Sequence, residues 1–232
     1  MDTSLPAALG LGLLLGLRHA LDADHVAAVS TLVSQHRSLA RSCLLGVFWG
    51  AGHTMALLAA GVGVIAFKLT ISPEVEKGLE TVVACVLILL GGHVLLRSVG
   101  TWTLHGHDHS HDGYSHRHLH LHVGEEDSPG HTHLFRLGGR PFLVGVLHGM
   151  AGSAALMLLV LATIPSPLSG LLYILVFGVG STAGMLVISG LIGIPFILSA
   201  RRSHTAHAAI QTLAGAASLV LGLALAWNQW GV

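Results

Sequence analysis

The apolar residues of this chain gather into six long runs that are separated by polar segments. A helix needs about 20 predominantly apolar residues to cross a bilayer, and each run is long enough for one crossing. The pattern therefore predicts an all-α polytopic membrane protein with six transmembrane helices. The six runs cover residues 5–34, 43–67, 79–98, 141–164, 168–199 and 207–230.

The longest polar interruption covers residues 100–140 and leaves three helices on either side, in residues 1–99 and 141–232. Small and polar positions of the two halves line up: residues 16–20 match 145–149, and residues 50–54 match 178–182. With three helices per half, the second half must enter the membrane in the opposite orientation. We therefore expect two inverted three-helix repeats joined by one long loop, the plan of many secondary transporters.

Composition and charge support a membrane protein and fix its orientation. The chain is 52% hydrophobic and only 9% charged, whereas a soluble domain carries about 25% charged residues. Eight Lys or Arg residues fall on the side of the long loop and two fall on the opposite side. By the positive-inside rule the loop is cytoplasmic and both termini lie outside a cytoplasmic (inner) membrane. The zero net charge gives no basic field for nucleic acid.

The first apolar run contains the charged residues Arg18, Asp22 and Asp24 together with His19 and His25. Each charge near the bilayer centre costs about 2.5–3.5 kcal/mol on insertion scales, so these groups must satisfy one another or face a polar cavity. One interpretation is an ion pair between Arg18 and Asp22, which are four residues apart on a helix. That pair leaves two histidines and a second aspartate unexplained.

A metal site explains more of this cluster. On a regular helix His19, Asp22 and His25 follow one face at i, i+3 and i+6. Two imidazoles and a carboxylate suit Ni²⁺, Co²⁺ or Zn²⁺ better than a soft ion such as Cu(I). Asp24 points away from His19 on a regular helix, so it must either join through a local break or orient an imidazole from outside.

Other helices offer further ligands. His53 in the second run is flanked by glycines that permit close backbone approach, and it is a candidate ligand. His148 lines up with His19 in the repeat and is a candidate for the opposite wall of a pathway. Hydroxyl groups that serve either a pathway or helix–helix hydrogen bonds belong to Ser153, Ser181 and Thr182.

The long loop is rich in histidine, spaced mostly at every second residue among aspartates and glycines. Such low-complexity tracts bind metal loosely and suit buffering, and we expect a flexible loop of this kind. The alternative is a solvated linker without a role in transport. A cytoplasmic metallochaperone is a candidate partner. The ten loop histidines are His105, His107, His109, His111, His116, His118, His120, His122, His131 and His133.

Residues 18–25 resemble the HX4DH signature helix of the nickel/cobalt transporter family, with His19 as the first histidine. Residues 52–54 resemble the Gly-His motif in the second helix of that family, and residues 147–153 are similar to a shorter urease-accessory-type branch. The resemblance implies a secondary importer of Ni²⁺ or Co²⁺ in which the signature helix is essential for uptake. Family members typically have eight helices, and this chain lacks their acid-rich motifs in its second half.

We expect uptake of the metal into the cytoplasm through the intramembrane His/Asp site. Two alternatives stay open: export of the metal, and metal delivery without transport to a metalloenzyme such as urease. An intramembrane metalloprotease would need an HExxH motif, which the sequence does not contain. We therefore expect no enzyme and no catalytic cofactor. The transported ion is expected to be Ni²⁺ or Co²⁺, with Zn²⁺ as a further candidate.

Overall fold

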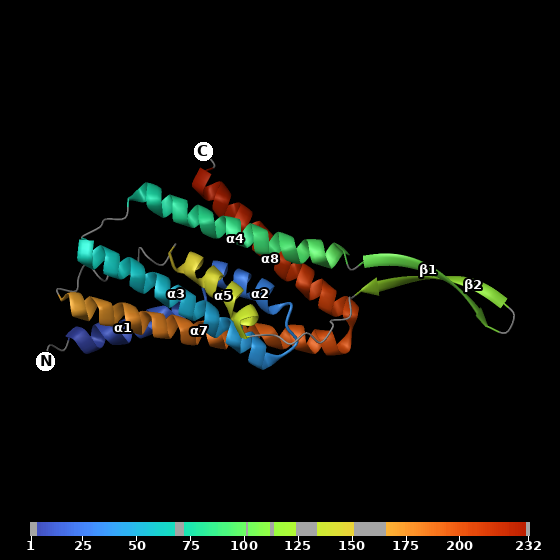
Figure 1. Ribbon diagram of the computed structural model, residues 1–232, viewed down its shortest axis with the longest axis horizontal. Helices are drawn as coiled ribbons and strands as arrows, with labels where there is room; N and C mark the ends of the chain where they lie inside the picture. The colour runs from blue at the N-terminus through green and yellow to red at the C-terminus, as the bar shows by residue number, and fades with distance from the viewer. Residues whose placement is uncertain are drawn as a thin grey trace.

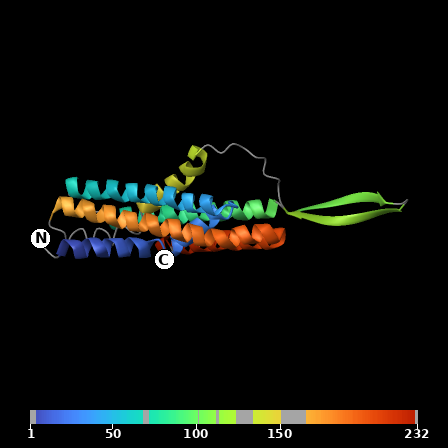
Figure 2. The same cartoon turned by 90° about the horizontal axis from the view of Figure 1, so that it is seen from below.

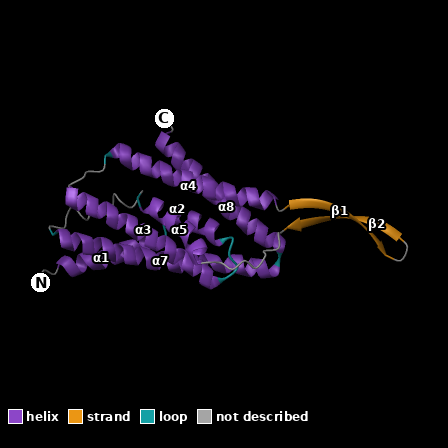
Figure 3. Ribbon diagram, viewed as in Figure 1, coloured by secondary structure: helices purple, strands orange, loops and turns teal. Residues whose placement is uncertain are grey.

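The computed structural model describes residues 4–67, 72–100, 102–111, 114–123, 134–150 and 166–230. It is a long helical bundle from one end of which a two-stranded hairpin projects (Figure 1, Figure 3). The described elements are α1 (Ser4–His19), α2 (Ala23–Val33), α3 (Leu39–Phe67), α4 (Pro73–Gly100), β1 (Trp102–His111), β2 (Tyr114–Val123), α5 (Leu134–Gly149), α7 (Pro167–Arg202) and α8 (His204–Trp230).

The chain is a multi-pass membrane protein built from apolar helices. Four helices, α3, α4, α7 and α8, are long and apolar enough to cross a membrane. The bent pair of α1 and α2 counts as a fifth crossing if it is one broken span. The sixth expected span, residues 141–164, begins in α5, but residues 151–165 lie outside the described part of the chain. The described residues therefore account for four or five of the six expected crossings.

The first apolar run is broken where the pattern predicts one continuous helix. Helix α1 ends at His19, α2 begins at Ala23, and the two axes differ by 55°. At the break the Asp22 backbone is extended, with φ −61° and ψ 144°, and its N–H donates to the His19 carbonyl at 3.0 Å. Aspartate favours helix starts over helix interiors, and the Asp24 carboxylate in the first turn of α2 interacts favourably with the helix dipole. The break places two helix ends inside the bundle.

The helices form two adjoining groups. Helix α7 lies between α1 and α3, as the view from below shows (Figure 2), and α5 packs against α3. Helices α4 and α8 pair along the other side of the bundle (Figure 1), and α2 contacts both of them as well as α7. Helix α2 therefore occupies the interior, where the first run is broken.

Helices α3 and α7 cross through glycine and threonine. A Cβ atom on Gly50 would lie 2.6 Å from the Cα of Thr182, and one on Gly178 would overlap the methyl group of Thr54. The Thr54 hydroxyl donates to the Gly178 carbonyl at 3.0 Å and lies 3.1 Å from the Thr182 hydroxyl. Gly178 and Thr182 follow Gly50 and Thr54 by 128 positions. The glycine of each half therefore packs against the threonine of the other half, and the four residues occupy equivalent positions.

Helices α4 and α8 show the same reciprocity. A Cβ on Gly91 would approach the Gly215 carbonyl oxygen at 2.5 Å, and one on Gly222 would approach the Ala84 carbonyl oxygen at 2.8 Å. Gly222 follows Gly91 by 131 positions, and Gly215 follows Ala84 by the same number. Close approach of this kind requires residues without side chains. The contact of α1 with α7 is likewise matched by that of α5 with α3, through Gly16 and Gly145.

The long loop contains a β-hairpin where a flexible tract is expected. Strand β1 pairs with β2 in antiparallel register. The physical reason is the alternation of histidine with other residues, which has the two-residue period of a strand, together with strand-favouring Thr, Tyr, Leu and Val. The register places histidines opposite histidines at His105–His120, His107–His118 and His109–His116. Two loop histidines, His131 and His133, lie outside the described residues.

Candidate metal centre

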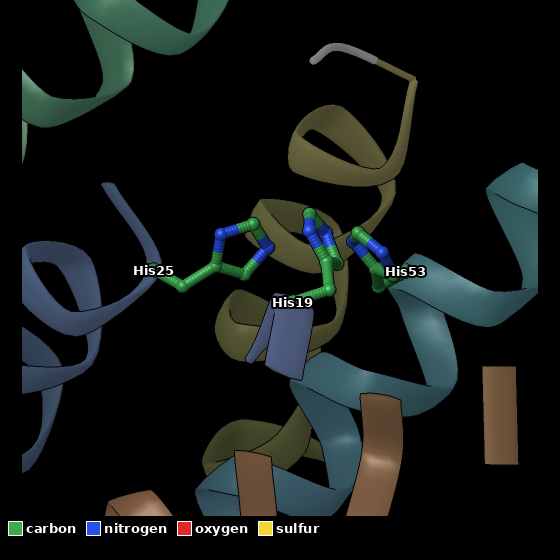
Figure 4. A group of neighbouring side chains, drawn as sticks. All are labelled: His19, His25 and His53. Carbon is green, nitrogen blue, oxygen red and sulfur yellow. The ribbon is translucent and has the colours of Figure 1, made fainter. Parts of the chain in front are cut away.

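Three histidines from three different helices converge at the break in the first run. His19 is the last residue of α1, His25 lies in the first turn of α2, and His53 lies in the middle of α3 (Figure 4). Each offers a ligand nitrogen, and the three nitrogens lie within 4.8 Å of one another. The ring centroids are separated by 4.4 Å for His19–His25, 5.0 Å for His19–His53 and 5.4 Å for His25–His53.

The three rings are buried, with residue exposures of 8% for His19, 2% for His25 and 0% for His53. The Nε2 atoms of His19 and His25 and both nitrogens of His53 have no hydrogen-bond partner among the described residues. A buried polar atom without a partner lowers the stability of the fold by about 1–3 kcal/mol. Several such nitrogens at one place therefore indicate a binding site for a ligand. Nitrogens bound to one metal at 2.0–2.1 Å lie up to about 4.2 Å apart. Small ring rotations would therefore bring this trio to coordination distance.

Asp22 takes a different position from the one expected. Because the helix is broken at this residue, His19, Asp22 and His25 do not follow one helical face. Instead the Asp22 carboxylate lies 2.7 Å from Nδ1 of His19, and its side chain is 52% exposed. A carboxylate on one ring nitrogen fixes the tautomer and turns the other nitrogen toward the metal. Asp22 is therefore placed to orient His19, with Nε2 directed into the cluster.

A second group adjoins the first. Asp24, His25 and His148 offer ligand atoms that also lie within 4.8 Å of one another. The Asp24 carboxylate lies 3.0 Å from Nδ1 of His25 and 3.4 Å from Nε2 of His148. His148 stands in the last turn of α5 and is 1% exposed. The break in the first run thus brings Asp24 to the cluster, and His25 belongs to both groups.

Trp49 forms a wall beside the two groups. Its ring stacks on His25 with 5.8 Å between centroids and meets the edge of His148 at 5.5 Å. The residue is 1% exposed, so this side of the cluster is dry. Sequence reasoning missed Trp49. The available signal was its spacing, since it precedes His53 by four residues and so lies on the same face of α3.

The backbone also favours a cation here. Helices α1 and α5 both end at the cluster, at His19 and Gly149. The C-terminal end of a helix carries partial negative charge and stabilises cations, and broken helices in transporters use their ends in this way. Helix α5 reaches this place because Gly149 packs on His53, where a Cβ would lie 2.9 Å from the His53 Cα.

The remaining expected site residues are placed outside the two groups. Arg18 is exposed and forms no ion pair with a carboxylate among the described residues, so it does not pair with Asp22. Ser181 is fully buried on α7, and its hydroxyl has no partner within the described part of the chain. Thr182 bonds Thr54 at the crossing of α3 and α7. Ser153 lies outside the described residues.

Known proteins match this chain over three quarters of its length or more. The urease accessory protein UreH of Bacillus sp. (strain TB-90) is 43% identical over 227 residues, which cover 98% of this chain and 93% of that protein. The chloroplast proteins FOR GROWTH AND FERTILITY 1 and 2 of Arabidopsis thaliana are 25% and 26% identical over 75% of this chain, and the matches cover 46% and 44% of those proteins. No solved structure matches.

The family model described as NicO, high-affinity nickel-transport protein, matches residues 6–226. That range includes the break between α1 and α2, the two histidine groups and at least part of every described helix. The relative from Bacillus is named as a urease accessory protein, which agrees with the resemblance of residues 147–153 to a shorter urease-accessory-type branch. The expected resemblance is therefore confirmed, and the chain belongs to the NicO family of high-affinity nickel-transport proteins.

Proposed function

We propose that this protein carries Ni²⁺ across the membrane through a site formed by His19, His25 and His53. The observation that carries the proposal is the convergence of three buried imidazoles from three helices, with ring nitrogens that have no partner among the described residues. Polar side chains at membrane depth are expensive and mark ion pathways. The family match to nickel-transport proteins supports nickel as the ion.

The ligand chemistry suits a borderline divalent ion. Neutral imidazole binds Ni²⁺ well, whereas an ion such as Mg²⁺ prefers oxygen ligands and Cu(I) prefers sulfur. Asp22 holds His19 in the tautomer that leaves Nε2 free to coordinate. Because the imidazoles must be neutral to bind, protons compete with the metal. Co²⁺ is a second substrate of the same site, because its ligand preferences are close to those of Ni²⁺.

The two halves of the bundle act as inverted repeats that rock against each other. Support comes from the reciprocal contacts of Gly50 with Thr182 and Gly178 with Thr54, and from the hydrogen-bonded threonines between them. In inverted-repeat transporters the substrate lies near the bilayer midplane, and rocking of one repeat exposes it to either side in turn. The cluster lies at the inner ends of α1 and α5, which is where such a plan places a substrate.

We infer that transport is directed inward across the cytoplasmic membrane. The excess of Lys and Arg on the side of the long loop supports a cytoplasmic hairpin and outward-facing termini. The hairpin presents several histidines close together along the backbone, which suits a loose acceptor for metal that leaves the bundle. Hydrated Ni²⁺ would exchange its waters for imidazoles in the cluster and would be released toward this acceptor.

Uptake of radioactive Ni²⁺ into proteoliposomes tests the proposal. A His53→Gln variant keeps a polar side chain of similar size but removes one ligand, so the initial rate should fall by at least about 10-fold. The matched control is His93→Gln, since His93 is an exposed histidine of α4 away from the cluster. Normal uptake by His53→Gln at equal protein content would contradict the proposal. Competition with Co²⁺, Zn²⁺ and Mn²⁺ ranks the substrates.

Delivery of nickel to urease is a second candidate function. The observation that favours it is the 43% identity to a protein named as a urease accessory protein, which covers 98% of this chain. Cells that express urease in limiting nickel provide the test. If the protein raises urease activity while purified protein in vesicles carries no Ni²⁺, it delivers without transport. If both occur, delivery follows from transport.

A further inference from the structure

We propose that the metal has a second binding position, formed by Asp24, His25 and His148, and that His25 hands the ion between the two positions. This is a site of two imidazoles and one carboxylate, which suits a borderline divalent transition-metal cation. The transfer step rests on the proposed transport function. The existence of the second position does not, because it concerns binding alone.

Geometry separates the two positions. Ligand atoms lie within 4.8 Å of one another in the group of His19, His25 and His53 and again in the group of Asp24, His25 and His148, but the residues do not form one larger group. The His25 ring lies 4.9 Å from that of His148. Within the described part of the chain no ring contact joins His148 to either His19 or His53. In this arrangement the candidate ligands therefore form two groups that share His25.

Unsatisfied groups mark the second position as a site. Both ring nitrogens of His148 are buried and lack a hydrogen bond among the described residues, and the nearer one lies 3.4 Å from the Asp24 carboxylate. The Asp24 side chain is 29% exposed, whereas His53 is fully buried. The carboxylate also supplies a negative charge that the first group lacks. The second position is therefore the more polar of the two.

The two positions divide between the halves of the chain. Every member of the first group belongs to the first half, whereas His148 comes from α5 in the second half. Helix α5 meets α3 at Gly52 and Gly145, where an added Cβ would overlap the carbonyl oxygens of Phe142 and Trp49. Glycine surfaces present no interlocking side chains. A shift of α5 along α3 would therefore open the second group, because His148 would move with α5 while Asp24 and His25 stay on α2.

Binding of Co²⁺ to the purified full-length protein in nanodiscs tests the second position, because the visible absorption of Co²⁺ reports its ligands. His53→Gln removes one ligand from the first position, so affinity should fall about 10- to 100-fold but weak binding should persist. His148→Gln in the wild-type background should change the affinity by less than about threefold, because the first position stays complete. Both variants are compared in a background in which glutamine replaces the ten loop histidines, because loose binding by the loop would mask a weak site in the bundle. In that background the double variant should lose the weak binding that remains in His53→Gln. His93→Gln is the control, and the melting temperature of each variant confirms folding.

The outcomes separate the two proposals. If the double variant binds Co²⁺ as well as His53→Gln does, the second position does not exist. If His148→Gln alone weakens binding as strongly as His53→Gln, the ligands form one site and the inference is also wrong. Asp24→Asn in the His53→Gln background should change the Co²⁺ spectrum, and an unchanged spectrum would remove the carboxylate from the site.

Ni²⁺ flux then tests the transfer. His148→Gln should lower the initial rate by at least about 10-fold while it keeps its Co²⁺ affinity. A normal rate with normal affinity would overturn the handover. Wild-type protein that binds Co²⁺ but carries no Ni²⁺ would defeat the proposed transport function and with it the handover, and the binding results would still decide whether the second position exists.

Discussion

The intramembrane cluster and the hairpin both offer several histidines, but they arrange them in different ways. In the bundle each histidine comes from a different helix and is held by packing, as His53 is by Gly149. In the hairpin the histidines repeat at every second residue, and neighbouring positions are interchangeable. The bundle therefore suits one ion in a defined geometry, whereas the hairpin suits several ions in similar, loose ones. Ligand type alone does not make a selective site.

The largest effect is expected for His25→Gln, because His25 belongs to both groups in the bundle. Loss of a ligand common to both positions should lower metal affinity by more than about 100-fold and abolish uptake. Co²⁺ titration and Ni²⁺ flux measure the two effects, with His93→Gln as the control. Uptake above a tenth of the wild-type rate would show that the cluster does not hold the transported ion.

Gly52→Ala should weaken the packing that fixes the cluster. The added Cβ would overlap the Phe142 carbonyl oxygen and push α5 away from α3. Overpacking of this kind costs about 1–3 kcal/mol in the free energy of unfolding.

The matched control is Gly92→Ala, since nothing lies within 4 Å of its added Cβ. That control should gain up to about 1 kcal/mol from helix propensity. Equal melting temperatures for the two variants would contradict the packing role.

Asp22→Ala should lower metal affinity by about 10-fold, because His19 would lose the carboxylate that orients its ring. Asp22→Asn keeps an acceptor oxygen and should recover part of this loss. Co²⁺ titration of both variants measures the difference. If Asp22→Ala lost all binding, Asp22 would be a direct ligand. If it lost none, the hydrogen bond would have no part in the site.

The smallest effect is expected when glutamine replaces the eight histidines within β1 and β2. The initial rate of Ni²⁺ uptake should change by less than about twofold, because loose metal-binding tracts buffer metal and do not form the transport site. The number of Co²⁺ ions bound per protein should fall clearly in the same variant. A large loss of uptake would remove the distinction between a selective bundle and a buffering hairpin.

The membrane character of the fold could be predicted because hydropathy reports directly on the solvent of a helix. The four apolar runs that became α3, α4, α7 and α8 illustrate this. The break at residues 20–22 was predictable only in part. Asp24 points away from His19 on a continuous helix, so the sequence offers a break as one way for it to join the site. The place of the break depends on Asp22 and on the packing around it.

Other parts of the site could not be predicted from helical periodicity. The alternative of an ion pair between Arg18 and Asp22 assumes a continuous helix, and the break directs Asp22 to His19 instead. The meeting of His148 with Asp24 depends on how α5 packs against the first half, which involves residues more than a hundred positions apart. Low-complexity composition does not predict the hairpin. The signal for it is the two-residue period of the histidines, which is the period of a strand.

The glycine contacts between the two halves are reciprocal, but the ligands are not shared equally between the halves. His53 corresponds to Ser181 under the offset of 128 residues that relates Gly50 to Gly178. Under the proposed rocking cycle, the two faces of the membrane therefore offer the ion unlike ligands. A passive carrier of this kind has different half-saturation concentrations on its two faces. Its maximal rates must then differ in the same proportion, because asymmetry cannot move the equilibrium set by the gradient.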